Sequence, residues 1–170
     1  MIYSFENSVF KDKETGLYSE AYFMEVFHRE WHRMIREHHA LSILIIHPNL
    51  DINKAKGLQE YVNLAHLLND STKRTTDLVS RFHNNEFIIG LFDLSPDGTT
   101  TIIERILDSI KESGSGTQVQ AKNAFIGGLN VYPSNNVDIG NVLQEAQTIT
   151  GLHSHTQIES HYELRSHEVH

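Results

Sequence analysis

The chain has 170 residues, of which 14 are Lys or Arg and 22 are Asp or Glu, so its formal net charge is −8. This length suits one domain with its own core, and 39% of the residues are hydrophobic. A net negative charge without a Lys/Arg-rich block argues against a protein that binds nucleic acid by neutralising its phosphates. The absence of cysteine excludes disulfides, thiolate zinc sites and cysteine nucleophiles.

No segment has the features of a membrane span or a signal peptide. The longest apolar stretch, residues 41–46, is far shorter than the roughly 20 residues that a spanning helix needs. Residues 1–7 contain no signal-peptide hydrophobic region. We therefore expect a soluble, cytoplasmic domain without membrane insertion.

The first half of the chain predicts a helix, a strand and a second helix. Apolar residues recur at helical spacing over residues 19–39, and Ser19 is available as the N-cap. Residues 40–47 form a nearly continuous, Ile-rich apolar run, which is typical of a strand buried on both faces and therefore central in a sheet. A second amphipathic pattern begins at Gly57 and fades in the polar run 69–76.

A hairpin and a third helix follow. Residues 77–82 and 86–92 are strand-like and are separated only by residues 83–85, whose Asn residues tolerate the positive φ of a tight turn. The third helix is expected to start after residues 96–98 and to stop at residues 113–116, a flexible Ser/Gly connector.

The last part of the chain completes a mixed sheet. Residues 123–132 predict a strand in which Gly127-Gly128 marks a bulge or a point of close approach. Residues 139–149 predict a fourth helix, and residues 156–164 a final edge strand. The alternation of helices and strands, with a hairpin inside the order, predicts a layered α/β domain.

The sequence contains 12 histidines, but no metal site is identifiable among them. His28 and His32 lie four residues apart on a predicted helix and could share one face, yet no third ligand accompanies them. A solvated helix face is the favoured interpretation. The same holds for the histidines near the C-terminus, which are His153, His155, His161, His167 and His170.

Two motifs and their order carry a resemblance to a known family. Residues 12–17 (DKETGL) are similar to a D-x-L-T-G-L motif before a long helix, with Glu14 in place of Leu. Residues 81–87 (RFHNNEF) lie on the predicted hairpin, where R-Y-G-G-D/E-E-F is expected. The chain thus resembles the GGDEF family, the bacterial diguanylate cyclases that make cyclic di-GMP from two GTP molecules.

The resemblance covers residues 10–160 and implies the fold. We expect residues 1–170 to form a single degenerate GGDEF-like domain. Its fold class would be α/β, with a nucleotidyl-cyclase-like (palm-type) mixed central sheet flanked by helices.

The catalytic positions implied by the resemblance are degenerate. His47 and Asn85 stand where the family has metal-binding acids, and neither is anionic. His83 and Asn84 replace the two glycines that leave room for a phosphate, so only Glu86 survives of the acidic cluster. Because phosphoryl transfer needs hard oxygen ligands around a divalent metal, we expect no catalytic residues, no bound metal and no cofactor.

Two further nucleotide-contacting segments also depart from the family pattern. Residues 52–57 retain Asn53, which could read a guanine edge or cap the next helix, but the family's guanine-binding Asp falls near Val62. Residues 146–151 are similar to the family's A-D-x-x-x-Y segment, with Ser154 where the phosphate-contacting Lys would stand.

One ligand-binding motif is retained. Arg74-Thr75-Thr76-Asp77 resembles the family's R-x-x-D inhibitory site, where cyclic di-GMP binds away from the active site. A guanidinium can donate two hydrogen bonds to the O6/N7 edge of guanine or hold a phosphate, and a carboxylate can accept from guanine N1–H and N2–H. The alternative is a plain surface pair at a helix-to-strand junction, where we expect both side chains to be exposed.

The sequence therefore predicts a catalytically inactive signalling domain that acts as a cyclic di-GMP receptor or regulatory module through Arg74 and Asp77. The alternative is a nucleotide-independent protein-interaction or dimerisation module with the same fold. An enzyme with altered chemistry is the third reading. We expect a protein partner or a homodimer, and no nucleic acid.

Overall fold

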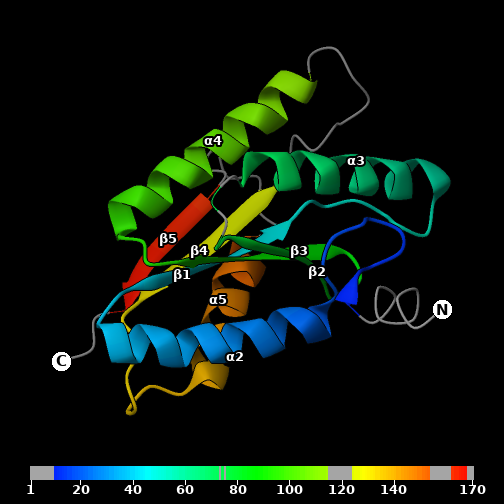
Figure 1. The fold of residues 1–170 in the computed structure, drawn as a ribbon. Coiled ribbons are helices and arrows are strands. Elements are labelled where there is room, and N and C mark those ends of the chain that lie inside the picture. The colour runs from blue at the N-terminus through cyan, green and yellow to red at the C-terminus, as the bar shows by residue number, and fades with distance from the viewer. Residues whose placement is uncertain (1–9, 73, 75, 115–123, 154–161, 168–170) are drawn as a thin grey trace.

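The computed structural model describes residues 10–72, 74, 76–114, 124–153 and 162–167. The described strands form one sheet, in the order β2-β3-β1-β4-β5, and helices cover both of its faces (Figure 1). In chain order the elements are α2 (Glu20–Glu37), β1 (Leu41–His47), α3 (Ala55–Ser71), β2 (Leu78–Phe82), β3 (Glu86–Phe92), α4 (Pro96–Gly114), β4 (Phe125–Val131), α5 (Ile139–His153) and β5 (Tyr162–His167).

Strand β1 is the centre of the sheet, as its apolar run predicts. It pairs antiparallel with β3 on one side and with β4 on the other, so that Leu41 lies opposite both Phe92 and Val131. Strand β5 adds to β4 in parallel at one edge, and the β2-β3 hairpin closes the other edge. The expected mixed α/β sheet is confirmed.

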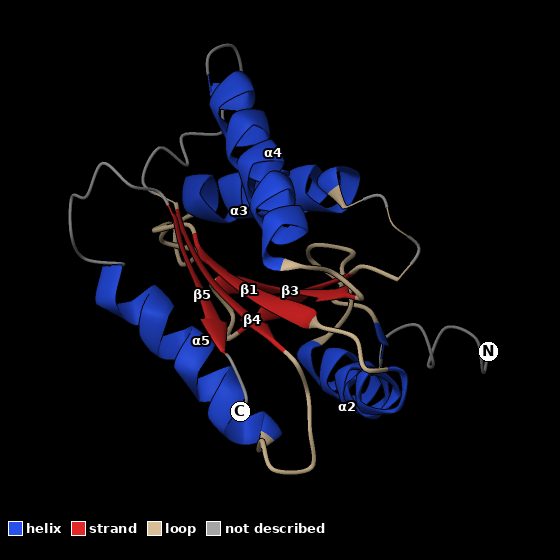
Figure 2. Cartoon of the chain, turned by 90° about the vertical axis from the view of Figure 1, so that its left-hand side faces the viewer, coloured by secondary structure: helices blue, strands red, loops and turns tan. Residues whose placement is uncertain are grey.

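Two hydrophobic cores explain why the central strand is apolar on both faces. Helices α3 and α4 cover one face, and α2 and α5 cover the other (Figure 2). Leu44 and Ile46 of β1 point into the first core, whereas Ile43 and Ile45 point into the second. The period-2 alternation of side chains along a strand therefore buries every residue from 41 to 46.

The helix boundaries differ in detail from the expected ones. Ser19 caps α2 as predicted, because its hydroxyl accepts a hydrogen bond from the Tyr22 N–H at 3.2 Å. Helix α3 begins at Ala55, before Gly57. Helix α4 begins at Pro96 and not after residue 98, because proline fits the first turn, where its missing N–H has no intrahelical partner.

The C-terminal edge strand is displaced from its predicted position. It runs from Tyr162 to His167, whereas the prediction placed it at residues 156–164, of which 156–161 lie outside the described residues. No helix in the described part of the chain is both long and apolar enough to cross a membrane.

The glycine pair on β4 serves close approach and forms no bulge. The ladder with β1 is continuous from Leu41↔Val131 to His47↔Phe125. A Cβ atom on Gly127 would lie 2.2 Å from the Thr150 hydroxyl of α5. The missing side chain thus lets α5 pack directly on the sheet.

We expect Gly127→Ala to lower the free energy of unfolding by about 1–3 kcal/mol, the usual range for overpacking a tight contact. Gly151→Ala on α5, the helix that packs against Gly127, is the matched control, because a Cβ there meets nothing within 4 Å. That change should leave stability unchanged or raise it by up to about 1 kcal/mol, since alanine favours helix more than glycine does. Chemical denaturation of both variants tests the difference, and equal stabilities would contradict it.

Candidate functional site

The hairpin turn holds two residues in the left-handed backbone region. Strand β2 ends at Phe82 and β3 begins at Glu86, and between them His83 has φ 48° and Asn84 has φ 64°. Non-glycine residues adopt positive φ rarely, and Asn does so more readily than most. The predicted hairpin is confirmed, and its strained positions are the two where the family resemblance places glycines.

A hollow of about 400 Å³ adjoins one side of this turn. It is lined by His47 from the end of β1, by His83, Asn85 and Glu86 of the hairpin, and by Gln147 and Gly151 of α5. The fold therefore brings together four of the five residues predicted as degenerate catalytic positions. Gln147 and Gly151 belong to the 146–151 segment that the resemblance places near the nucleotide, and their spacing of four places them on one helix face.

Within the hollow, Glu86 is paired with His47. His47 Nδ1 lies 3.2 Å from Glu86 Oε2, and each side chain is 20% exposed. Tyr61 of α3 donates a hydrogen bond to the Glu86 backbone carbonyl at 2.6 Å and stacks on Phe87 with ring centroids 4.3 Å apart. Burial raises the pKa of Tyr61 above its usual value, so the phenol stays neutral and remains a donor.

No group of three or more His, Asp or Glu side chains that could hold a metal ion occurs among the described residues. His28 and His32 are both exposed on α2, which fits the solvated-face interpretation. The side chains of the C-terminal histidines fall outside the described part of the structure, as does Ser154.

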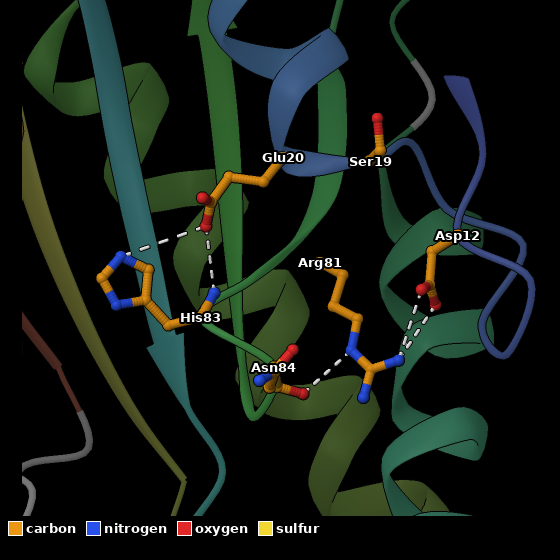
Figure 3. Close-up of a pocket in the computed structure, with 6 residues that line it drawn as sticks. All are labelled: Asp12, Ser19, Glu20, Arg81, His83 and Asn84. Carbon is orange, nitrogen blue, oxygen red and sulfur yellow. Dashed lines mark hydrogen bonds and ion pairs between the residues drawn. The ribbon is translucent and has the colours of Figure 1, made fainter. Parts of the chain in front are cut away.

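A second hollow, of about 600 Å³, lies on the other side of the turn and contains a charged clamp (Figure 3). The Arg81 side chain is only 12% exposed, and its Nη1 lies 3.2 Å from Asp12 Oδ2 and 2.8 Å from Glu14 Oε1. Its Nε donates to the Asn84 backbone carbonyl at 2.9 Å. Arg81 thus joins the DKETGL segment to the hairpin turn.

The DKETGL segment is itself a compact loop. The Asp12 carboxylate accepts hydrogen bonds from the Thr15 N–H at 3.0 Å and from the Thr15 hydroxyl at 2.7 Å. Gly16 follows with φ 74°, a conformation that glycine adopts without strain. These bonds account for Asp, Thr and Gly at these positions through local structure alone.

The same hollow shows how α2 contacts the turn. The His83 backbone N–H donates to Glu20 Oε1 at 3.1 Å, and the His83 ring lies 4.0 Å from the same oxygen (Figure 3). Glu20 comes from the first turn of α2, where a carboxylate is also favoured by the helix dipole. The side chains of His83 and Asn84 therefore occupy the surface that two glycines would leave open.

We expect Arg81→Ala to lower the free energy of unfolding by about 1–2 kcal/mol, because it removes the charged partner of the partly buried Asp12 carboxylate and a hydrogen bond to the turn. The exposed Arg29 on α2, whose replacement by Ala should change stability by less than about 0.5 kcal/mol, is the control. Urea unfolding of both variants measures the effect. An Arg81→Ala protein as stable as the control would show that the clamp is not structural.

The Arg74–Asp77 motif spans the junction between α3 and β2. Arg74 is 38% exposed, and its Nη2 donates to the Phe92 carbonyl at 2.8 Å and to the Asp93 carbonyl at 3.4 Å. Asp77 Oδ2 accepts from the Arg74 N–H at 3.3 Å, and Oδ1 lies 3.9 Å from Arg74 Nη1. Arg74 and Asp77 therefore contact each other, and Arg74 also binds the backbone at the end of β3.

The expectation that both side chains are exposed is wrong for Asp77, which is only 2% exposed. Burial raises the pKa of Asp77, against the opposing effects of Arg74 and of Arg105 on α4. Its Oδ1 is buried and makes no hydrogen bond within the described part of the structure. Sequence reasoning missed Arg105, because only the packing of α4 brings it near Asp77.

The expected guanine-reading positions do not form a comparable group. Asn53 is exposed, and its backbone N–H donates to Asp51 Oδ1 at 3.1 Å. It does not cap α3, whose N-cap residue is Lys54. Val62 is partly buried on α3 and offers no polar atom from its side chain.

Comparison with protein-family models shows to which family the chain belongs. The family model described as "Diguanylate cyclase, GGDEF domain" matches residues 9–152. This chain belongs to the GGDEF family. A comparison with curated protein sequences gives no match.

Solved GGDEF structures share the fold. The GGDEF domain of PA1120 (TpbB or YfiN) from Pseudomonas aeruginosa is 23% identical, with a TM-score of 0.72, 93% of this chain covered and 94% of that one. Vibrio cholerae LapD, an S helix-GGDEF-EAL protein bound to c-di-GMP, is 14% identical with a TM-score of 0.75 and 97% of this chain covered. P. aeruginosa SiaD, in complex with its activator SiaC, is 17% identical with a TM-score of 0.69 and 90% covered. The chain spans only 39% of the LapD chain and 60% of the SiaD chain.

Proposed function

We propose that this GGDEF domain is catalytically inactive and acts in the cytoplasm as a cyclic di-GMP receptor or regulatory module. In this proposal Arg74 and Asp77 bind the dinucleotide, and Arg105 adds positive charge near them. The buried Asp77 Oδ1 carries the proposal. A carboxylate oxygen that is out of water and without a hydrogen bond is under-satisfied, and the N1–H and N2–H donors of guanine would satisfy it.

The geometry of Arg74 is compatible with this role. Nη2 is used by two backbone carbonyls, which fixes the plane of the guanidinium. No hydrogen bond from Nε is present within the described residues, so the Nε–H group is available to a guanine acceptor or a phosphate. LapD and DgcB of Caulobacter crescentus are relatives whose structures were solved with c-di-GMP.

The proposal of inactivity rests on the His47–Glu86 pair. In the hollow beside the turn the one retained carboxylate faces an imidazole at 3.2 Å, and its neighbour Asn85 carries no charge. A divalent metal that bridges phosphates needs anionic oxygen ligands, which this arrangement does not supply.

The second candidate is a nucleotide-independent interaction or dimerisation module. It is favoured by the hydrogen bonds that Arg74 and Asp77 already make to the protein's own backbone, which leave the junction stable without a ligand. SiaD shows that a structural relative assembles with a protein partner, named SiaC.

Isothermal titration calorimetry of the chain with cyclic di-GMP, GTP and GDP separates these proposals. Saturable binding of cyclic di-GMP alone supports the receptor. No binding of any nucleotide supports the interaction module. Metal-dependent GTP binding would contradict both and indicate an enzyme with altered chemistry.

A further inference from the structure

A buried polar network crosses the apolar core between the sheet and α4. Ser42 is the single polar residue of the run 41–46 in β1, and it lies opposite Asn130 of β4. Asn130 Nδ2 donates to Ser42 Oγ at 2.8 Å, and Ser42 Oγ lies 2.6 Å from Thr99 Oγ1 of α4. Ser42 and Thr99 are 0% exposed and Asn130 is 2% exposed. Polar groups buried this deeply cost stability unless they are hydrogen-bonded, and a fully bonded network fixes the geometry around it.

The number of protons sets the direction of these hydrogen bonds, because each hydroxyl carries only one. Thr99 donates its proton to the Ser95 carbonyl at 2.8 Å, so Ser42 is the donor to Thr99. The Asn130 amide has two protons, and Nδ2 also donates to the Leu94 carbonyl at 3.0 Å. The network therefore uses all of its side-chain protons and ends on two adjacent backbone carbonyls, those of Leu94 and Ser95.

These two carbonyls directly follow the two that hold Arg74. Arg74 Nη2 donates to the Phe92 carbonyl at 2.8 Å and to the Asp93 carbonyl at 3.4 Å, and Leu94 and Ser95 come next, in the turn between β3 and α4. Asp93 has φ 57°, a left-handed conformation that L residues adopt at a cost, so contacts on either side must hold this turn. The buried network holds its second half, and the first half presents the acceptors of Arg74.

We propose that Asn130 is a positioning residue for Arg74 and acts through the turn 92–95. By holding the Leu94 carbonyl, it keeps the Phe92 and Asp93 carbonyls directed at the guanidinium. Arg74 is then ordered before a ligand arrives, and binding costs less conformational entropy. This inference rests on the proposed receptor function, and it adds to that site a residue of β4 that does not itself touch the ligand.

Asn130→Leu tests the proposal, because it removes both donors and keeps a buried side chain of similar size. We expect the affinity for cyclic di-GMP to fall about three- to tenfold, the equivalent of about one hydrogen bond. Thr99→Val keeps the shape of its side chain and breaks the other branch of the network, so it is the milder second variant. It should weaken binding in the same direction by about two- to threefold, a smaller share of that energy, because the Asn130–Leu94 bond remains. Wild-type affinity in the folded variants would overturn the proposal.

Ser80→Ala is the matched control for the loss of a buried hydroxyl. Ser80 is also 0% exposed and donates to a backbone carbonyl, that of Tyr18 at 2.8 Å, which lies outside the turn 92–95. This variant should bind cyclic di-GMP as the wild type does, even where its unfolding midpoint falls. If Ser80→Ala loses as much affinity as Asn130→Leu, the effect is one of general stability and the proposal is wrong.

A double-mutant cycle shows whether Asn130 acts through Arg74. In an Arg74→Ala protein, Asn130→Leu should change the affinity by less than about twofold, because the side chain that it positions is absent. A residue with an independent effect would weaken binding by the same factor in both backgrounds. That result would overturn the proposal and leave the receptor function intact.

A ligand-free measurement separates the failure of this proposal from the failure of the receptor function. NMR detection of the Arg74 guanidinium should show an ordered side chain in the wild type and in Ser80→Ala, and a mobile one in Asn130→Leu. If the wild type binds no cyclic di-GMP but shows this difference, the receptor function fails and the positioning role stands. An equally ordered guanidinium in Asn130→Leu would overturn the positioning role itself.

Discussion

Purified protein is expected to form no detectable cyclic di-GMP from GTP with either Mg²⁺ or Mn²⁺. His47 and Asn85 offer no anionic oxygen at the positions where metal-binding acids are implied, and Glu86 is paired with His47 at 3.2 Å. His83 and Asn84 place side chains beside the turn, where close approach of a phosphate needs glycine. Loss of one charge-stabilising group commonly slows catalysis about 100- to 1,000-fold, and several are lost here. Chromatographic detection of the product measures the outcome.

A stepwise repair locates the defect. Restoring the turn alone, with His83→Gly, Asn84→Gly and Asn85→Asp, should leave the protein inactive, because His47 still denies the metal a carboxylate. Adding His47→Asp should then produce the first detectable metal-dependent GTP binding. The same three turn changes combined with His66→Asp are the control for an added carboxylate at an exposed site. Full activity from the turn repair alone would mean that His47 is not the metal position.

Arg74→Ala is expected to weaken cyclic di-GMP binding by at least about 1–3 kcal/mol, the value of a good bidentate contact to a guanine edge. The change removes the guanidinium and its positive charge, and it also frees the Phe92 and Asp93 carbonyls. Calorimetry measures the loss, with the exposed Arg29→Ala as a control for the loss of one positive charge. Unchanged affinity in a folded Arg74→Ala protein would place the ligand elsewhere.

Asp77→Asn should weaken binding less than Arg74→Ala does, because it keeps the shape and one of the two acceptor oxygens and loses the charge and the other acceptor. The Asp77→Asn protein should stay folded, because Asp77 is buried and an uncharged side chain suits that environment. Burial raises the pKa of this carboxyl, so the folded state holds its proton more tightly than the unfolded state does. Its contribution to stability is greatest at low pH and is lost as the pH rises through the raised pKa. A neutral Asn is therefore tolerated at neutral pH, which thermal unfolding can confirm.

The architecture follows from patterns within single segments. The uninterrupted apolar run of β1 requires that both faces of the sheet be packed against other elements. The helical spacing of apolar residues in α2 predicts an amphipathic helix that packs on one of these faces. The hairpin turn is equally local, because the two strand-like runs leave only three residues between them. The exact ends of the helices are harder to predict from the sequence. Pro96, for example, fits either the loop before α4 or the first turn of that helix.

The amino-acid sequence by itself determined the fold and which positions we propose to be degenerate, because both depend on residue type and on spacing along the chain. Only the tertiary structure decided what these residues contact. The His47–Glu86 pair joins two strands, Asp77 is buried by the α3–β2 junction, and Arg105 approaches it only because α4 packs on that face. Burial and through-space charge are properties of neighbours distant in sequence, so no local pattern contains them.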